Sequence, residues 1–142
     1  MGAAPAQFVD QRQVRRNFAR AAPTYDEVAV LQREVGSRML ERLDYVRIEP
    51  KRILDLGCGT GASLTALHER YGSAAVIGAD LSEAMLRAGK ARRSRLRWLL
   101  PFVRGNRPPL LAADAAALPF GVRSFGLLWT NLMLHWLDDP LP

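Results

Sequence analysis

The sequence predicts an α/β fold in which a doubly wound parallel sheet follows two amino-terminal helices. Three observations support this prediction. Short apolar runs alternate with helical segments after Pro50, one run ends in a glycine-rich loop at residues 57–61, and acidic or amide residues follow the apolar runs. Strands that alternate with helices favour right-handed crossovers and parallel pairing. Ligands of such sheets bind beyond the carboxyl ends of the strands.

The first 49 residues predict two helices. The first covers residues 10–21, with Val14 and Phe18 four apart on one side, and Pro23 ends it. The second covers residues 26–46, because apolar side chains recur there at steps of three and four residues. These side chains are Val28, Leu31, Val35, Met39, Leu43 and Val46. We interpret the stripe as a packing face, with a groove for a partner as the alternative.

Strands and helices alternate in the rest of the chain. The predicted strands are residues 52–56, 74–79, 110–113 and 124–130, and the predicted helices are residues 62–70 and 82–92. Asp80, Asp114 and Asn131 follow predicted strands, as the glycine loop does, so all of them fall where ligands bind. A sheet that stopped after the fourth strand would have an apolar edge strand. We therefore expect the front part of a larger domain, or a chain that needs a covering partner.

Composition limits the functional classes. The 142 residues suffice for one small domain, and the formal net charge of +6 suits an acidic partner or a nucleic acid without identifying either. A single cysteine, Cys58, excludes an intrachain disulfide and a multi-cysteine metal site. The longest apolar stretch, residues 125–137, is interrupted by polar residues and is too short to span a bilayer. No segment resembles a signal peptide, so we expect a cytoplasmic protein without a metal site or a membrane contact.

The glycine loop carries the strongest functional signal. Residues 53–61 read Ile-Leu-Asp-Leu-Gly-Cys-Gly-Thr-Gly. Closely spaced glycines let backbone approach a ligand, and a helix amino terminus favours an anion such as pyrophosphate. The loop also fits the dinucleotide pattern G-x-G-x-x-A. However, the charge of Asp55 would repel a pyrophosphate and attract a cation. S-adenosylmethionine, with its sulfonium and ammonium groups, fits that charge.

Two further acids are candidates for binding the rest of such a ligand. Asp80 lies about 20 residues beyond the loop, where a carboxylate can accept hydrogen bonds from both ribose hydroxyls. The alternative role for Asp80 is a helix cap. Asp114 can accept a hydrogen bond from an adenine amino group, but a plain turn residue would give the same pattern.

The predicted cofactor-binding residues are Tyr25, Asp55, Gly57, Cys58, Gly59, Gly61, Asp80, Leu81, Asp114, Ala115 and Asn131. Tyr25 and Gln32 can fold over the ligand from the amino-terminal helices. His135 lies near the expected approach of a methyl acceptor and can act as a base, although a lone histidine is more often structural. Eight basic residues and no acidic one occupy residues 87–107, with Trp98 and Phe102 between them. A solvated face competes here with a site for an acidic protein or RNA.

These motifs resemble those of the class I S-adenosylmethionine-dependent methyltransferases. The resemblance runs from Arg52 to the end of the chain. It is carried by the glycine loop, Asp80 with Leu-Ser-Glu-Ala-Met-Leu after it, Ala113-Asp114-Ala115 with Leu118-Pro119-Phe120, and Ser124-Phe125. It implies an incomplete Rossmann-like fold that binds S-adenosyl-L-methionine. Residues 1–49 would be a helical segment covering the cofactor site, and residues 50–142 a cofactor-binding core truncated after the fourth strand.

Two more segments are similar to the malonyl-[acyl-carrier protein] O-methyltransferases of biotin synthesis. They are Asn17-Phe18-Ala19-Arg20-Ala21-Ala22 with Tyr25-Asp26 and Leu31-Gln32-Arg33, and Trp129-Thr130-Asn131-Leu132 with His135-Trp136. This resemblance implies methyl transfer to the malonyl carboxylate on an acidic carrier protein, with no role for nucleic acid. A carboxylate is already ionised at neutral pH, so no catalytic base is named.

The sequence departs from the family at two points. Gly126 stands where members commonly carry an acid, and the carboxyl-terminal strands have no counterpart in the chain. The alternative functions are methylation of another small molecule such as a quinone precursor, methylation of RNA, and cofactor binding without catalysis.

Overall fold

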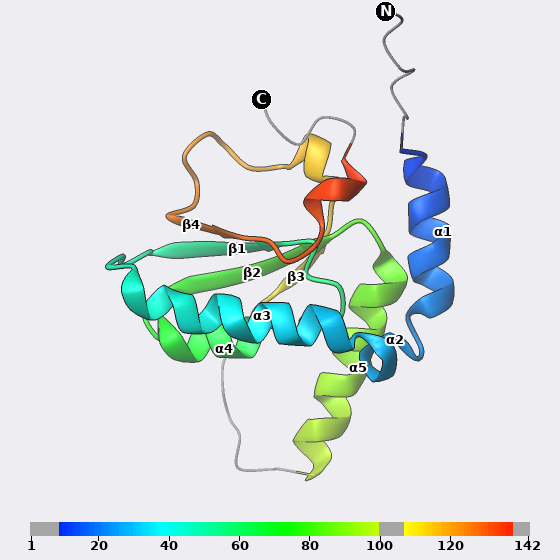
Figure 1. Ribbon diagram of the computed structural model, residues 1–142, viewed down its shortest axis with the longest axis horizontal. Helices are drawn as coiled ribbons and strands as arrows, with labels where there is room; N and C mark the ends of the chain where they lie inside the picture. Colours follow the sequence, from blue (N-terminus) through cyan, green and yellow to red (C-terminus); the bar gives the residue numbers. More distant parts are fainter. Residues whose placement is uncertain (1–8, 100–106, 138–142) are drawn as a thin grey trace, which may run out of the picture.

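The computed structural model describes residues 9–99 and 107–137. They form a parallel sheet with helices packed around it (Figure 1). The strands are β1 (Arg52–Leu56), β2 (Ala75–Asp80), β3 (Leu110–Ala112) and β4 (Leu127–Trp129), in the order β3-β2-β1-β4. All three strand pairs are parallel, which confirms the predicted sheet.

The sheet buries a different set of side chains on each face. On one face, Ile53 and Val76 pack with Leu64 and Leu67 of α4 (Leu64–Arg70). The helix α3 (Val30–Arg42) adds Met39, Leu40 and Leu43 to this cluster and runs across the sheet in Figure 1. On the other face, Leu54, Leu56 and Ala79 pack under the segments that follow β3 and β4. The strands are therefore fixed from both sides, which holds their carboxyl ends in register.

The two helices that flank the site begin at side-chain caps. The Asp10 carboxylate accepts hydrogen bonds from the Arg12 and Gln13 amides at the start of α1 (Gln11–Ala21). The Ser82 hydroxyl accepts one from the Met85 amide at the start of α5 (Glu83–Leu99). These contacts satisfy amides that a helix leaves free in its first turn. Both predicted starts are confirmed, although α5 extends beyond the predicted end at residue 92.

The prediction of one helix over residues 26–46 is wrong. The structure has α2 (Tyr25–Val28), a break at Ala29, then α3 and a 3₁₀ turn, η1 (Leu43–Tyr45). Ala29 leaves the helical region with a ψ of 47°. Only Met39 and Leu43 of the apolar stripe pack on the core cluster, whereas Val28, Leu31 and Val46 are 70%, 64% and 48% exposed. Periodicity alone could not reveal the break, because the contacts that hold α2 in place are distant in the sequence.

The predicted fourth strand, residues 124–130, is also too long. The ladder of β4 begins at Leu127, and only the Gly126 amide, which donates to the Arg52 carbonyl, precedes it. Ser124 belongs to a turn in which its hydroxyl donates to the Gly121 carbonyl. A polar side chain bonded to local backbone competes with strand pairing, which explains the shortening.

Candidate functional site

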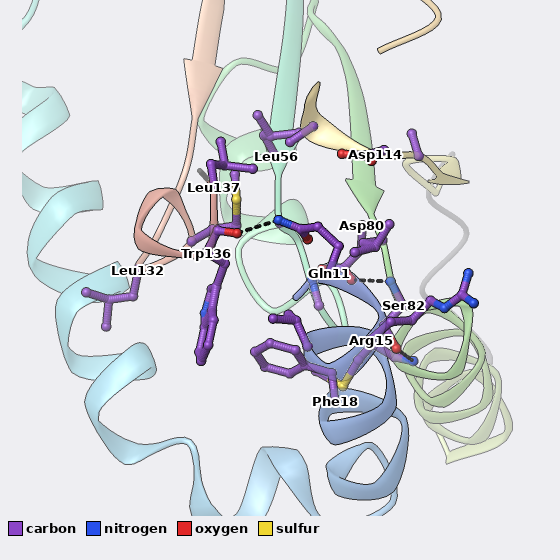
Figure 2. Close-up of a pocket in the computed structure, with 18 of the residues that line it drawn as sticks. Gln11, Arg15, Phe18, Leu56, Asp80, Ser82, Asp114, Leu132, Trp136 and Leu137 are labelled. Atoms are coloured by element: carbon purple, nitrogen blue, oxygen red, sulfur yellow. Dashed lines mark hydrogen bonds between the residues drawn. The ribbon is translucent and has the colours of Figure 1, made fainter. Parts of the chain in front are cut away.

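Two adjoining pockets lie at the carboxyl ends of β1 and β2. The first is lined by α1, by the ends of both strands and by the segments after β3 and β4 (Figure 2). The second has a volume of about 410 Å³ and is lined by α2, α3, the glycine loop and Asp55. Tyr25, Gly57, Gly59 and Asn131 line both pockets, so a ligand that fills the two would pass these residues. The sequence predicted a site at this edge of the sheet.

The glycine loop turns away from β1 in a backbone conformation that requires glycine. Gly57 has a φ of +74°, and a Cβ on it would overlap the Met133 side chain. The amides of Gly57 and Cys58 donate to the Ala79 carbonyl at 2.8 and 3.0 Å, which ties the loop to β2. Loop and strand ends therefore form one rigid floor beneath both pockets.

Asp55 places a buried carboxylate on the wall of the second pocket. It sits within β1, paired in register with Gly78 and Trp129, and is only 3% exposed. Within the described part of the chain, no group donates a hydrogen bond to it. Burial, and secondly the charge of Asp80, raise the pKa of Asp55 to about 7. A cation in this pocket would relieve both costs and favour the ionised carboxylate.

Asp80 bonds the backbone on both sides of the end of β2 and also faces the first pocket. One carboxylate oxygen accepts from the Gly59 amide and the other from the Ser82 amide, both at 2.8 Å. Figure 2 shows the bond to Ser82. Burial raises the pKa of Asp80, and the two backbone hydrogen bonds oppose that rise. A carboxylate has about four acceptor positions, so two remain for a ligand. The cap of α5 is Ser82, while Asp80 ties the glycine loop to the residue before that helix, and its role toward a ligand stays a prediction.

Asp114 likewise combines a turn role with a place at the first pocket. Its side chain accepts from the Ala116 amide at 2.9 Å and caps the 3₁₀ turn η2 (Ala115–Ala117). Leu81 and Ala115 line the same pocket. Their positions agree with the sequence interpretation, and their roles toward a ligand stay predictions.

Asn131 holds the amino-terminal helices against the sheet. Its side-chain amide donates to the Gln32 carbonyl of α3 at 2.7 Å. The same side chain has a buried oxygen, Oδ1, without a hydrogen-bond partner among the described residues. Asn131 lines both pockets, and a ligand donor that reached this oxygen would satisfy it. Asn131 was predicted as a site residue, but its bond to α3 was not.

The helix α1 closes the first pocket from the side. Gln11 donates from its amide nitrogen to the Trp136 carbonyl at 2.6 Å, and the Phe18 ring meets the Trp136 ring edge-on at 5.6 Å (Figure 2). Phe18 also contacts Tyr25, with ring centroids 6.2 Å apart. Burial, followed by the charges of Asp80 and Asp26, raises the pKa of Tyr25. Helical spacing had marked Phe18 as part of a face without showing what that face covers.

The part of the chain that forms the floor of both pockets matches a known family. A family model described as a methyltransferase domain matches residues 53–142, which begin in β1 and include the glycine loop, Asp80 and Asp114. The chain belongs to the methyltransferase domain family. The resemblance predicted from the sequence is thereby confirmed.

Two curated relatives of this methyltransferase domain have the same name. A malonyl-[acyl-carrier protein] O-methyltransferase of Halorhodospira halophila is 48% identical over 98% of this chain and 44% of its own length. One of Methylovorus sp. is 44% identical over 96% of this chain and 45% of its own length. The chain thus spans less than half of each of these two relatives.

A solved structure supports the fold of the methyltransferase domain. The [4+2]-cyclase SpnF matches it with a TM-score of 0.68, at 22% identity, over 99% of this chain and 56% of that protein. Because SpnF is named a cyclase, the shared fold does not by itself determine the reaction. The Rossmann-like class predicted from the sequence is nevertheless confirmed.

Three residues that the sequence singled out, Gly61, Cys58 and His135, have structural contacts that do not depend on a ligand. Gly61 shapes the turn, with a φ of +81°, but lines neither pocket. Cys58 lines the second pocket as a buried thiol whose pKa is raised by burial and then by Asp55 and Asp80, so it stays protonated. His135 is exposed and rests against the Trp136 ring, with centroids 4.7 Å apart. No contact of His135 with the described residues supports a role as a base.

The basic run of the methyltransferase domain is partly used by the fold itself. Arg92 pairs with Asp26, Arg87 pairs with Glu83, and Arg93 and Arg107 donate to backbone carbonyls. The side chains of Arg97, Trp98, Phe102 and Arg104 lie outside the described residues. The run is therefore not simply a solvated face, since Arg92 and Arg93 serve internal contacts.

The described residues offer neither a metal site nor a membrane span. No group of histidine, cysteine or acidic side chains among them is placed to hold a metal ion. No helix in residues 9–99 or 107–137 is long and apolar enough to cross a membrane.

Proposed function

We propose that this chain binds S-adenosyl-L-methionine and forms the cofactor-binding part of a methyltransferase that acts on malonyl-acyl carrier protein in biotin synthesis. The observation that supports the methyl donor most directly is the buried Asp55 carboxylate, which has no hydrogen-bond partner among the described residues. A cationic ligand is the chemistry that this group favours. The curated relatives, matched over nearly the whole chain, support the acceptor.

The two pockets match the two halves of the proposed methyl donor. The second pocket holds Asp55 for an ammonium or sulfonium group, and it also contains Arg33 and Arg92, whose charge suits a carboxylate. The first pocket holds Asp80 and Asp114 for polar groups of a nucleoside, between apolar side chains that suit a base. In this proposal, residues 1–49 cover the site and residues 50–142 form its core.

The chain's own residues bind, orient and shield in this mechanism. When bound, the cofactor supplies an electrophilic methyl group, and the protein contributes alignment. Asp55 attracts the cationic end, Asp80 fixes the nucleoside, and α1 to α3 limit the access of water to the pockets. A malonyl carboxylate is ionised at neutral pH, so the reaction needs no base from the chain.

The positive charge of the chain suits the proposed partner. A carrier protein is acidic, and the net charge of +6 favours encounter with it. A cytoplasmic location is part of the same proposal. Binding through charge predicts that added salt weakens the encounter.

A transfer assay with labelled methyl donor tests the function. We expect label on malonyl-carrier protein, and none on carrier protein without the malonyl group. The Asp55→Asn chain should transfer less at a fixed low concentration of methyl donor, while Glu83→Gln, which removes an exposed pair on α5, should behave like wild type. Binding of methyl donor without transfer would identify a non-catalytic module. Transfer to RNA or to a quinone precursor instead would overturn the acceptor, and preferential binding of NADH would overturn the methyl donor.

A further inference from the structure

Asp26 joins three elements around the second pocket. Its Oδ1 accepts a hydrogen bond from the Thr60 hydroxyl of the glycine loop at 2.6 Å. Its Oδ2 lies 3.3 Å from Nη1 of Arg92 on α5. Asp26, Thr60 and Arg92 all line the second pocket together with Asp55. One carboxylate on α2 therefore meets both the floor and the far wall of that pocket.

The two partners of Asp26, Thr60 and Arg92, belong to the glycine loop and to α5. These two elements pack tightly together and are called the base of the pocket. Thr60 is only 2% exposed, and α5 packs directly on its carbonyl because Gly89 has no Cβ. The loop itself is tied to β2 through Asp80 and the Ala79 carbonyl. Neither Thr60 nor the α5 backbone at Gly89 can therefore move without disturbing the core.

The helix α2, by contrast, has few other contacts with the described residues, chiefly that of its Tyr25 ring with Phe18 of α1. It has four residues, no side-chain cap and no buried residue. Helices this short are unstable by themselves and depend on tertiary contacts. The Arg33 guanidinium donates to the Asp26 carbonyl, which links α2 to α3 and not to the base. The Asp26 carboxylate is thus the main polar connection between α2 and the base.

We propose that Asp26 is a latch: its carboxylate holds α2 over the second pocket and thereby sets how fast a ligand leaves. Asp26 is a positioning residue in this role, since it acts by placing the cover. The identity of the ligand rests on the proposed function, whereas the hold on α2 does not.

The two contacts of the latch differ in how salt affects them. The side chains of Asp26 and Arg92 are 34% and 48% exposed, so ions in solution screen this pair. The bond from the buried Thr60 hydroxyl is shielded and resists salt. Raised salt should consequently loosen the latch without opening it fully.

Amide hydrogen exchange on the chain without ligand tests the hold on α2. Asp26→Ala removes both contacts and should speed exchange of the amides in residues 25–33 about tenfold, with β1 unchanged. Asp26→Asn keeps an oxygen for Thr60 and should have a smaller effect. Arg38→Gln, which removes an exposed pair with Glu34 on α3, is the matched control and should resemble wild type. Equal exchange in Asp26→Ala and wild type would overturn the latch.

The release rate of S-adenosyl-L-homocysteine tests the coupling to the pocket. In stopped flow, Asp26→Ala and Thr60→Val should release this probe about tenfold faster than wild type, and Thr60→Ser should restore slow release. Salt should accelerate release from wild type more than from Asp26→Ala, because only wild type has the screened pair of Asp26 with Arg92, a difference that a merely structural role would not produce.

The possible failures are distinguishable. Faster exchange with an unchanged release rate would overturn the coupling of Asp26 to ligand exit. If the wild type binds neither S-adenosyl-L-homocysteine nor the methyl donor, the proposed function fails, and hydrogen exchange still decides whether Asp26 holds α2.

Discussion

At the scale of single residues, Asp55 combines a structural cost with a binding role. A carboxylate inside β1, without a hydrogen-bond donor among the described residues, is costly to ionise, and its pKa of about 7 expresses that cost. An apolar residue at this position would fit the core better. The acid makes chemical sense only if a cation shares the pocket. A bound cation would remove the cost of the buried charge, so the free energy that the free protein loses at Asp55 would be recovered on binding.

The pKa of Asp55 predicts how binding depends on pH. A cation binds the ionised carboxylate, and below pH 7 the free protein must first release a proton. The affinity for S-adenosyl-L-methionine should therefore fall by up to about tenfold per pH unit as pH decreases below 7. Calorimetry between about pH 5.5 and 7.5 measures this slope, a window chosen to stay below the titration of the ligand's amino group. The Asp55→Asn chain should bind weakly with a flat profile, and an equal slope in that variant would assign the titration elsewhere.

At the scale of elements, Asp80 is a joint between the glycine loop, β2 and α5. Its two backbone bonds fix the Gly59 amide and the start of α5 at once. A ligand bound through the remaining acceptor positions would meet a side chain that is already held in place. Such preorganisation lowers the entropy cost of binding.

Removing this joint should affect both stability and affinity. Asp80→Ala should lower the free energy of unfolding by about 1–3 kcal/mol through two lost charged hydrogen bonds. It should also weaken binding of the methyl donor by about 1–3 kcal/mol. Asp114→Ala, which loses one bond in an exposed turn, is the matched control and should destabilise less. Denaturant unfolding and calorimetry measure the two effects, and an unchanged affinity in Asp80→Ala would leave Asp80 only the role of joining the loop to β2 and α5.

Gly89 marks a second contact between elements, that of α5 with the glycine loop. Helix propensity at this position favours alanine, whereas packing against Thr60 favours glycine. Replacing a glycine within a helix by alanine normally stabilises it by about 1 kcal/mol. Here the new Cβ would overlap the Thr60 carbonyl, so Gly89→Ala should instead destabilise by about 1–3 kcal/mol. Gly72→Ala is the control, because a Cβ added at Gly72 would meet no atom within 4 Å. Chemical denaturation compares the two, and a more stable Gly89→Ala would show that α5 does not press on the loop.

Local patterns predicted the floor of the site but not its cover. The apolar run before Gly57, the acid at Asp55 and the acid that ends β2 are read within short windows, and the strand order places them together. The contact of Asp26 with Thr60 joins residues 34 apart and leaves no periodic trace. The helix breaks at Ala29, close to that contact. The apolar stripe from Val28 to Val46 continues across the break, so the pattern predicted a single helix. Long-range polar contacts override local preference here.

At the scale of the whole molecule, three hydrogen bonds among the described residues join the amino-terminal helices to the segments that follow β1 and β4. They are Gln11 with the Trp136 carbonyl, Asp26 with Thr60, and Asn131 with the Gln32 carbonyl. Each lies beside one of the pockets, and together they surround the space that a ligand would fill. The hydrogen bonds that hold residues 1–49 to the core therefore lie at the ligand site, so we expect the cover and the core to unfold together.

This coupling predicts one cooperative unfolding transition that ligand shifts as a whole. S-adenosyl-L-homocysteine at about 100 times its Kd should stabilise the chain by about 2.7 kcal/mol. Far-ultraviolet circular dichroism includes the helices of the cover, whereas tryptophan fluorescence comes only from residues 98, 129 and 136 of the core, and both should give the same raised Tm. NADH at the same concentration should leave Tm unchanged, because its pyrophosphate would meet the charge of Asp55. Separate transitions from the two probes would show that the cover folds independently of the sheet, and a larger shift with NADH would mean that the pockets favour a dinucleotide.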